Sequence, residues 1–241
     1  MREKISVCIA TYNGEKYIED QIKSILPQLS DYDEIIISDD SSVDKTLEII
    51  KAFKDDRIKI FDKQEFKSPI FNFENAIKHA TNEIIFLSDQ DDIWLENKVV
   101  TMLAALKDYD LVVSNAIITD ADLNLVKGSY FEWRNSRSGI IKNFIKNSYL
   151  GCCTAFKRKI LNIVLPFPKN IPMHDMWLGI IAELYYKPIF IDEKLILYRR
   201  HDDNTTLLTK DYTSNETILS KLQFRLNLFT AVIKRIIKRK F

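Results

Sequence analysis

The sequence predicts an α/β domain, in which a mostly parallel β-sheet is flanked by helices, followed by a C-terminal amphipathic helical appendage. Two observations predict this fold class. Through the first half of the chain, short runs of consecutive apolar residues alternate with amphipathic segments. This pattern is typical of a parallel sheet covered on both faces. The chain has 241 residues, 46% of them hydrophobic and 29% charged, which suits one globular domain and a short appendage.

In the first half, a helix is expected after each of the first four strands. The predicted strands are continuous apolar runs at residues 5–10, 34–38, 57–61, 83–88 and 110–114. The predicted helices have apolar residues at intervals of three and four and lie at residues 17–26, 71–80 and 95–106. One further helix is expected to be capped by Ser41 or Ser42 and to end near Phe53.

The second half is less regular. Residues 116–150 are polar with scattered aromatics, and only residues 140–145 indicate an element there, of a type that the pattern leaves open. The remaining predictions are a helix at 176–186, short strands at 188–191 and 195–198, a loop at 203–214, and a helix from Glu216 to the end.

The composition excludes several classes of protein. A net charge of +1 argues against a nucleic-acid binder that works through bulk electrostatics. The five glycines are scattered, so neither a dinucleotide fingerprint nor a P-loop can form. If the chain binds a nucleotide, another group must hold the phosphates.

Cysteines and apolar runs bear on the compartment. Cys8, Cys152 and Cys153 form no paired framework, which favours a reducing cytoplasm. The apolar run at residues 5–9 is too short for a signal peptide, and no run approaches the ~18–20 residues of a spanning helix. We therefore expect a cytoplasmic protein that does not cross a membrane.

Polar and acidic residues follow three of the predicted strands, at residues 11–13, 39–44 and 89–92. Ligands of open parallel sheets bind beyond the C-terminal ends of the strands. A single Asp after a strand is usually a helix cap or a turn residue. Two clusters of adjacent carboxylates repel each other, however, and a divalent cation relieves that repulsion. Such ligands suit Mg²⁺ or Mn²⁺, which would hold the phosphates in place of a glycine loop.

Five motifs carry a resemblance to a known family. They lie at residues 7–13, 37–46, 87–94, 174–178 and 191–201. In this order and spacing they resemble the family 2 glycosyltransferases, which have the Rossmann-like GT-A fold. The Asp-Gln-Asp-Asp-x-Trp form that begins at Asp89 resembles the branch containing bacterial rhamnosyltransferases of surface-polysaccharide synthesis.

The resemblance implies how a nucleotide would be bound. Ala10, Thr11 and Tyr12 would line the nucleobase pocket. Asp40 would accept a hydrogen bond from the base, and Asp39 would shape the turn that carries it.

The resemblance also implies the metal ligands and the base. Asp89 and Asp91 would be the Asp-x-Asp element, with Asp91 as the direct ligand of Mg²⁺ or Mn²⁺, and His201 would lie near the metal or the diphosphate. Asp175 would be the general base. Arg199 could reach the diphosphate, although basic residues that flank a strand are commonly just solvated.

The activity implied is the inverting transfer of a sugar from a nucleoside diphosphate to a hydroxyl of a saccharide or lipid-linked saccharide. Rhamnose is suggested by the branch, and capsule, O-antigen or cell-wall polysaccharide by the family. One base implies inversion, because retention by double displacement needs a second carboxylate. The implied domain spans residues 1–205, with a nucleotide-binding half to about 115 and an acceptor half from 116, and leaves 206–241 as a tail. No nucleic-acid partner is expected, and a homo-oligomer stays open.

Three other functions are compatible with some of these features. A nucleotidyltransferase would ordinarily have a glycine-rich N-terminal loop, which this sequence lacks. A receiver-like phosphoacceptor domain is about half this length. A catalytically degenerate GT-A protein that serves as an assembly or membrane partner is disfavoured by the intact Asp89, Asp91 and Asp175 but stays open.

The C-terminal helix has an apolar stripe and a basic end. The stripe comprises Ile218, Leu219, Leu222, Leu226, Phe229, Ile233, Ile236 and Ile237, and five Lys and Arg residues follow Ile233. Two interpretations remain open: the helix packs on the domain, or it makes a peripheral contact with an anionic membrane.

Overall fold

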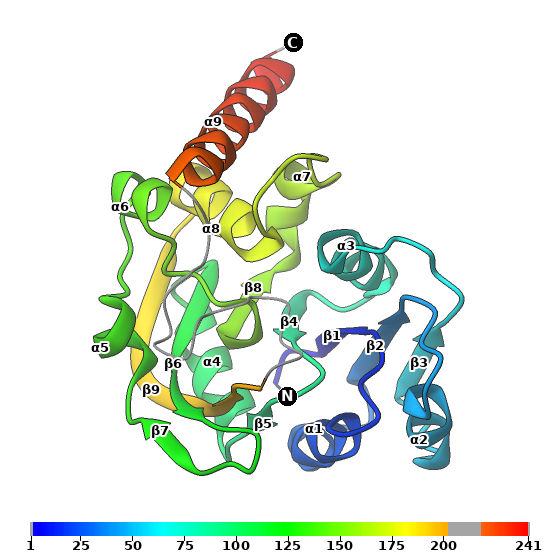
Figure 1. Cartoon of the computed structure of the whole chain (residues 1–241). Coiled ribbons are helices and arrows are strands. Elements are labelled where there is room, and N and C mark those ends of the chain that lie inside the picture. Colours follow the sequence, from blue (N-terminus) through cyan, green and yellow to red (C-terminus); the bar gives the residue numbers. More distant parts are fainter. Residues whose placement is uncertain (1, 202–217, 241) are drawn as a thin grey trace.

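The structure is a computed structural model that describes residues 2–201 and 218–240 (Figure 1). Its elements in the first half are β1 (Ile5–Thr11), α1 (Ile18–Ile25), β2 (Glu34–Asp39), α2 (Thr46–Ala52), β3 (Ile58–Phe61), α3 (Pro69–His79), β4 (Ile84–Ser88), β5 (Ile93–Trp94) and α4 (Lys98–Leu106). The second half contains β6 (Leu111–Thr119), β7 (Leu125–Lys127), α5 (Tyr130–Arg134), α6 (Ile140–Ile145), β8 (Thr154–Lys157), α7 (Leu161–Val164), α8 (His174–Tyr185), β9 (Pro188–Arg199) and α9 (Ile218–Lys240).

The described strands form one sheet in the order β3-β2-β1-β4-β8-β6-β9-β5, with β7 paired to β6. Neighbours from β3 to β4 are parallel, and so are β6 and β9. The α/β fold class is therefore confirmed. The sheet is mixed, however, because β8 runs antiparallel to both of its neighbours and β5 and β7 pair antiparallel as well.

Helices cover both faces of the sheet, as predicted. In Figure 1, α3 lies on one side of β1 and β2, and α1 and α2 lie on the other. The strands between them are fully buried apolar runs, such as Ile35, Ile36 and Ile37 of β2. Because both faces are covered, continuous apolar sequence rather than alternation is what these strands require.

The strand predicted in two pieces, at 188–191 and 195–198, is a single strand. β9 runs beside β6, and its pairing jumps from Ser114↔Ile191 to Asn115↔Lys194. The bulge therefore absorbs Asp192 and Glu193, which are exposed. The prediction was wrong because this polar pair interrupts the apolar pattern without ending the strand.

The expected cap of the second helix was also wrong. α2 begins at Thr46 with Lys45 before it, and neither predicted serine caps it. The carboxylate of Asp44 instead accepts from the amide of Thr46 at 3.0 Å. Ser42 is occupied elsewhere, because its hydroxyl donates to Asp39 Oδ2 at 2.6 Å.

In the segment 116–150, the element expected at 140–145 is present, and the structure shows it to be the helix α6. The rest of that segment is more regular than its polarity suggested, since β6 continues to Thr119 and β7 and α5 follow. The predicted loop at 203–214 lies outside the described residues, as does Glu216.

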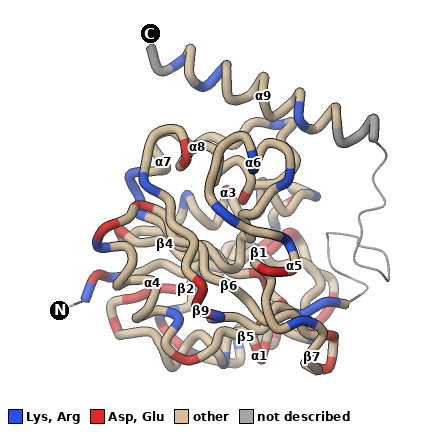
Figure 2. Tube along the Cα trace, turned by 90° about the vertical axis from the view of Figure 1, so that its left-hand side faces the viewer, with Lys and Arg blue, Asp and Glu red and all other residues tan. Residues whose placement is uncertain are grey.

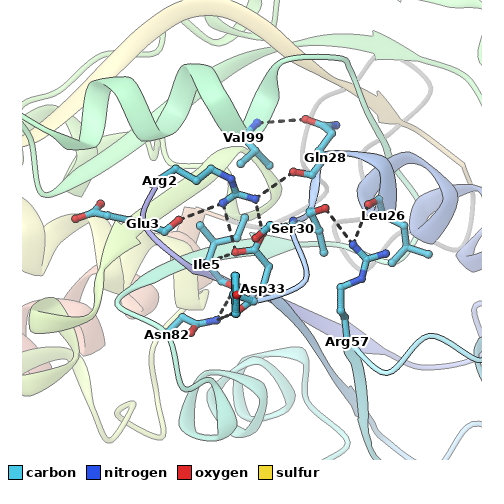
Figure 3. A network of polar contacts seen from close by, with 12 residues as sticks. Arg2, Glu3, Ile5, Leu26, Gln28, Ser30, Asp33, Arg57, Asn82 and Val99 are labelled. Carbon is cyan, nitrogen blue, oxygen red and sulfur yellow. Dashed lines mark hydrogen bonds and ion pairs between the residues drawn. The ribbon is translucent and has the colours of Figure 1, made fainter.

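A polar network ties the amino ends of β1 and β2 together, at the edge opposite the strand ends described below (Figure 3). Its centre is the buried carboxylate of Asp33, which accepts from the guanidinium of Arg2. It also accepts from the amide of Ile5 at 2.9 Å and from the amide of Ser30 at 2.7 Å. These bonds fix where the first two strands start.

The helix expected at the C-terminal end is present as α9, and one side of it packs on the domain. Leu228 and Val232 are buried. Arg235 donates to the backbone carbonyls of Leu165 and Pro166 at 2.7 and 2.5 Å. Among the described residues, no helix combines the length and apolar character needed to span a bilayer.

Candidate functional site

A cavity of about 630 Å³ opens where β1, β2 and β4 end, beside the first turns of α3 and α8. It is lined by Ala10, Thr11, Tyr12, Asp40, Ser41, Glu65, Lys67, Ser68, Pro69, Asn72, Phe73, Asp89, Gln90, Asp91, Met173, His174 and Tyr198. This is the strand edge at which the sequence predicts ligand binding.

Asp39 holds the turn after β2. It is fully buried, and its Oδ2 accepts from Thr11 Oγ1 at 2.8 Å. Its Oδ1 accepts from the amide of Ser42 at 2.9 Å. The first contact joins the end of β1 to the end of β2, and the second holds the turn after β2, so this carboxylate braces the turn beside the cavity.

Asp40 lines the cavity and holds a neighbouring loop. Its Oδ1 accepts from the amide of Phe66 at 2.6 Å, and its Oδ2 accepts from the amide of Ser68 at 3.2 Å. Each carboxylate oxygen has a further lone pair for a ligand. Asp40 thus combines a structural contact with a position in the cavity.

Gln90, which the sequence analysis did not single out, connects the turns after β1 and β4. Its Oε1 accepts from the amide of Tyr12 at 2.9 Å, and its Nε2 donates to the carbonyl of Tyr12 at 3.1 Å. Gly14 leaves room for this side chain, because a Cβ there would lie 2.5 Å from Gln90 Oε1 and would push the amide aside. The signal was present in the sequence, since Gln90 stands inside the acidic motif.

Three carboxylates crowd together after β4. Burial, followed by the charges of Asp91 and Asp175, raises the pKa of Asp89 to about 7. Burial and the charges of Asp91 and Asp89 raise the pKa of Asp92 well above its ordinary value. Like charges held this close disfavour ionisation, and a cation would remove the cost.

The predicted metal ligands are only partly grouped as expected. His201 Nε2 lies 2.9 Å from Asp91 Oδ2, so these two are neighbours. In the described part of the chain, a second grouping joins Asp89 to Asp92 and Cys152, whose ligand atoms lie within 4.8 Å of one another. Burial raises the pKa of the Cys152 thiol, so the carboxylates are the better ligands for a hard cation.

Arg199 lies behind the carboxylates rather than on the cavity wall. Its amide donates to Asp92 Oδ1 at 2.9 Å. Its buried guanidinium lies 4.7 Å from the centre of the Tyr17 ring and 3.6 Å from Asp20 Oδ2. In this arrangement its side chain is directed to α1.

Asp175 is buried at the start of α8. Burial raises its pKa to about 7, although hydrogen bonds from the backbone of Met176 and Gly151 and from Asn147 lower it. The Nδ2 atom of Asn147 is 3.5 Å from Asp175 Oδ1. A carboxylate with a pKa near neutrality can exchange a proton under physiological conditions.

His174 is a second site residue that the sequence analysis did not assign. It is 3% exposed, its ring is stacked on Phe73 with centroids 4.2 Å apart, and burial lowers its pKa to about 3. Within the described residues, neither of its ring nitrogens has a hydrogen-bond partner. It therefore contributes a neutral imidazole to the cavity wall.

The structure thus brings six of the predicted site residues into the lining of one cavity, namely Ala10, Thr11, Tyr12, Asp40, Asp89 and Asp91. The other four do not line it. Asp39 braces the turn, Asp175 lies next to the lining residue His174, His201 contacts Asp91, and Arg199 faces α1.

Comparisons with known proteins show which family the sequence matches. The model of the family described as glycosyl transferase family 2 matches residues 6–164. The dTDP-rhamnosyl transferase RfbG of Shigella flexneri is 31% identical over 81% of this chain and 72% of its own length. The GalNAc(5)-diNAcBac-PP-undecaprenol beta-1,3-glucosyltransferase of Campylobacter jejuni is 36% identical over 85% of this chain and 67% of its own length.

Solved structures share the fold. S. aureus TarS 1-349 in complex with UDP-GlcNAc aligns with a TM-score of 0.67 at 17% identity, over 94% of this chain and 71% of that one. The mannosyltransferase PcManGT from Pyrobaculum calidifontis, in complex with GDP-Man and Mn2+, aligns with a TM-score of 0.65 at 20% identity, over 85% of this chain and 59% of that one. At these identities the likeness establishes the GT-A fold alone.

Proposed function

Because the chain belongs to glycosyl transferase family 2, we propose that it transfers a sugar from a nucleoside diphosphate to an acceptor hydroxyl with inversion, in the presence of Mg²⁺ or Mn²⁺. The observation that carries this proposal is the arrangement around the cavity. Asp40, Asp89 and Asp91 line it, and Asp175, with a pKa of about 7, follows the lining residue His174 in the chain.

The residues present fit a divalent metal. Asp89 and Asp91 face the cavity, and their oxygen donors suit a hard cation. Burial and neighbouring carboxylates raise the pKa of Asp89. Its ionised form is therefore disfavoured unless a cation balances the negative charge. A bound Mg²⁺ or Mn²⁺ would supply neutralisation of the diphosphate charge.

Asp175 is proposed as the general base. An acceptor hydroxyl is a poor nucleophile until its proton is removed, and a positioned carboxylate typically contributes ~10²–10⁴-fold. Asn147 and the amides of Gly151 and Met176 hold the Asp175 carboxylate in place. One base acting on a direct displacement inverts the anomeric carbon.

The donor and the acceptor are proposed from the relatives. RfbG is named a dTDP-rhamnosyl transferase, which supports rhamnose as the sugar. The Campylobacter jejuni relative is named for an undecaprenol-linked acceptor, which supports a lipid-linked saccharide and a role in surface-polysaccharide assembly. We place the enzyme in the cytoplasm, in peripheral contact with the inner face of the membrane.

The test is a release assay with a panel of UDP-glucose, UDP-GlcNAc, dTDP-rhamnose and GDP-mannose. With Mn²⁺ or Mg²⁺ and a saccharide acceptor, dTDP-rhamnose should release its nucleoside diphosphate and yield a product of inverted anomeric configuration. EDTA and Asp175→Asn should each abolish that release. Tight metal-dependent donor binding without turnover on any donor would instead support a degenerate GT-A protein.

A further inference from the structure

Two helices far apart in the sequence hold most of the exposed apolar surface. In the described part of the chain, eight of the fourteen exposed large apolar side chains lie on α6 and α9. They are Ile141, Ile145, Leu222, Phe224, Leu226, Phe229, Ile233 and Ile237. Phe224, two positions after Leu222, lies on the opposite side of α9, and we call the other seven side chains the α6–α9 surface. Exposed apolar patches of this kind mark contact with a partner or a membrane.

The two helices lie side by side. Figures 1 and 2 both place the first part of α9 next to α6, and Arg225 Nη2 donates to the carbonyl of Ile145 at 2.6 Å. Along α9, Leu222, Leu226 and Phe229 recur at helical spacing and so share one side. That side differs from the one through which α9 packs on the domain.

Charge is distributed as unevenly as apolar surface. Residues 133–150 and 217–241 contain eleven of the 35 Lys and Arg residues and none of the 34 Asp and Glu residues, so the rest of the chain carries 24 basic against 34 acidic residues, a net −10. Burial and the positive charges of Lys146, Arg134 and Arg137 lower the pKa of Lys142 to about 8, which shows how closely these cations gather. Figure 2 shows no acidic residue along α9.

The apolar side chains and the basic charge together indicate which partner fits the α6–α9 surface. A second copy of the chain would bring two basic surfaces together, and like charges oppose such a contact. A nucleic acid would use the charges but gain nothing from side chains such as Ile141, which is 74% exposed. An anionic bilayer takes up apolar side chains at its headgroup boundary and attracts basic residues.

We propose that α6 and α9 together form one docking surface for an anionic lipid bilayer. This proposal rests on the proposed function, because the segment after α6 contacts Asp175, the proposed base. α6 ends at Ile145, and Asn147, two residues later, contacts Asp175. Docking through α6 would therefore bring Asp175 near the bilayer. The hydroxyl of a membrane-anchored saccharide would then lie close to the base that removes its proton.

The experiment is co-sedimentation of the full chain with vesicles of phosphatidylcholine, alone or mixed with phosphatidylglycerol. The first variant is Ile141→Glu with Ile145→Glu, at side chains 74% and 63% exposed. Its matched control is Val100→Glu with Leu125→Glu, 59% and 71% exposed but outside the surface. A second variant, Arg137→Glu with Lys146→Glu, reverses two exposed charges without touching an apolar residue.

The wild type should bind the anionic vesicles and only weakly the neutral ones. The Ile pair should lose at least about tenfold in partitioning, and the charge pair should lose about fivefold or more for each residue reversed. The Val100 and Leu125 control should partition like the wild type. Raised salt should weaken binding of the wild type, since the Debye length shortens.

Equal binding to neutral and anionic vesicles, or unchanged binding by the Ile pair, would overturn the proposal. A wild-type dimer that the Ile pair dissociates would assign the surface to a second copy. Binding of an RNA oligonucleotide that survives the Ile pair, without vesicle binding, would assign it to nucleic acid. Manganese-dependent binding of a nucleoside diphosphate, measured in the same preparations, reports separately on the active site and on folding.

Discussion

The Nε2 atom of His201 lies 2.9 Å from Asp91 Oδ2, joining residues 110 positions apart in the sequence. His201 follows β9, whereas Asp91 follows β4, and the His201 ring also packs on Tyr17 of the segment before α1, with centroids 4.4 Å apart. The edge proposed to bind the metal is therefore assembled from both halves of the chain. Its geometry depends on β9 as much as on the acidic motif.

From this contact we predict that His201→Ala weakens Mn²⁺ binding. Loss of a residue that orients or assists a ligand typically costs 10–100-fold in metal affinity, so a reduction of about tenfold is expected, in the presence of a nucleoside diphosphate. Calorimetric titration with Mn²⁺ would measure it. His79→Ala is the matched control, because His79 is exposed on α3 and hydrogen-bonds within its own helix. Equal affinities of the two variants would contradict the role of His201.

A second prediction concerns catalysis by Asp175. Asp175→Asn should bind the donor within a few-fold of the wild type while turnover falls by ~10²-fold or more. In the wild type, turnover should rise with pH through about 7, because burial raises the pKa of Asp175 to that value and the base acts in its ionised form. The variant should lose this rising limb. Substantial activity in Asp175→Asn would place the base elsewhere.

The same carboxylate should lower stability when it ionises. Its pKa is raised from 3.8 to about 7 in the folded chain. Between these two pH values the folded chain keeps a proton that the unfolded chain releases, so the free energy of unfolding falls as pH rises from about 4 through 7. In EDTA, the melting temperature of Asp175→Asn should therefore exceed that of the wild type by more at pH 8 than at pH 5. Thermal unfolding at both pH values tests this. A difference in melting temperature that does not change with pH would refute it.

Replacing Asp33, which has a structural role, should change stability rather than nucleotide binding. Asp33→Ala removes the acceptor for Arg2 and for the amides of Ile5 and Ser30. Leaving such groups unpaired should cost about 2–3 kcal/mol of unfolding free energy, or roughly 5–10 °C in melting temperature. Nucleotide affinity should stay the same, because this network lies at the opposite strand ends. Loss of nucleotide binding in a folded Asp33→Ala protein would contradict this separation.

The sequence was sufficient for the first half of the fold because each signal there is local. β2 is a run of apolar residues closed by Asp39, and α3 shows helical spacing, so neither needs distant information. β8 was missed because four residues, Thr154–Lys157, are too few for a pattern. Its place between β4 and β6 is decided by tertiary pairing.

The same division holds for the site. Asp40, Asp89 and Asp91 follow strands directly and could be placed on one edge from sequence. The roles of Gln90 and Asn147 could not, because each depends on a contact with a residue 78 or 28 positions away. Arg199 shows the converse, since its position in a motif did not reveal that its side chain is directed to α1.

We propose that carboxylates with a divalent metal, rather than a glycine loop, hold the donor's diphosphate. Calorimetry of UDP, dTDP and GDP with the full chain tests it most directly, with Mn²⁺ or with EDTA, for the wild type and Asp91→Ala. At least one of the three should bind with Mn²⁺, EDTA should remove this binding, and Asp91→Ala should lose the metal-dependent part of the affinity. A nucleoside diphosphate bound equally well in EDTA, or by Asp91→Ala, would contradict it.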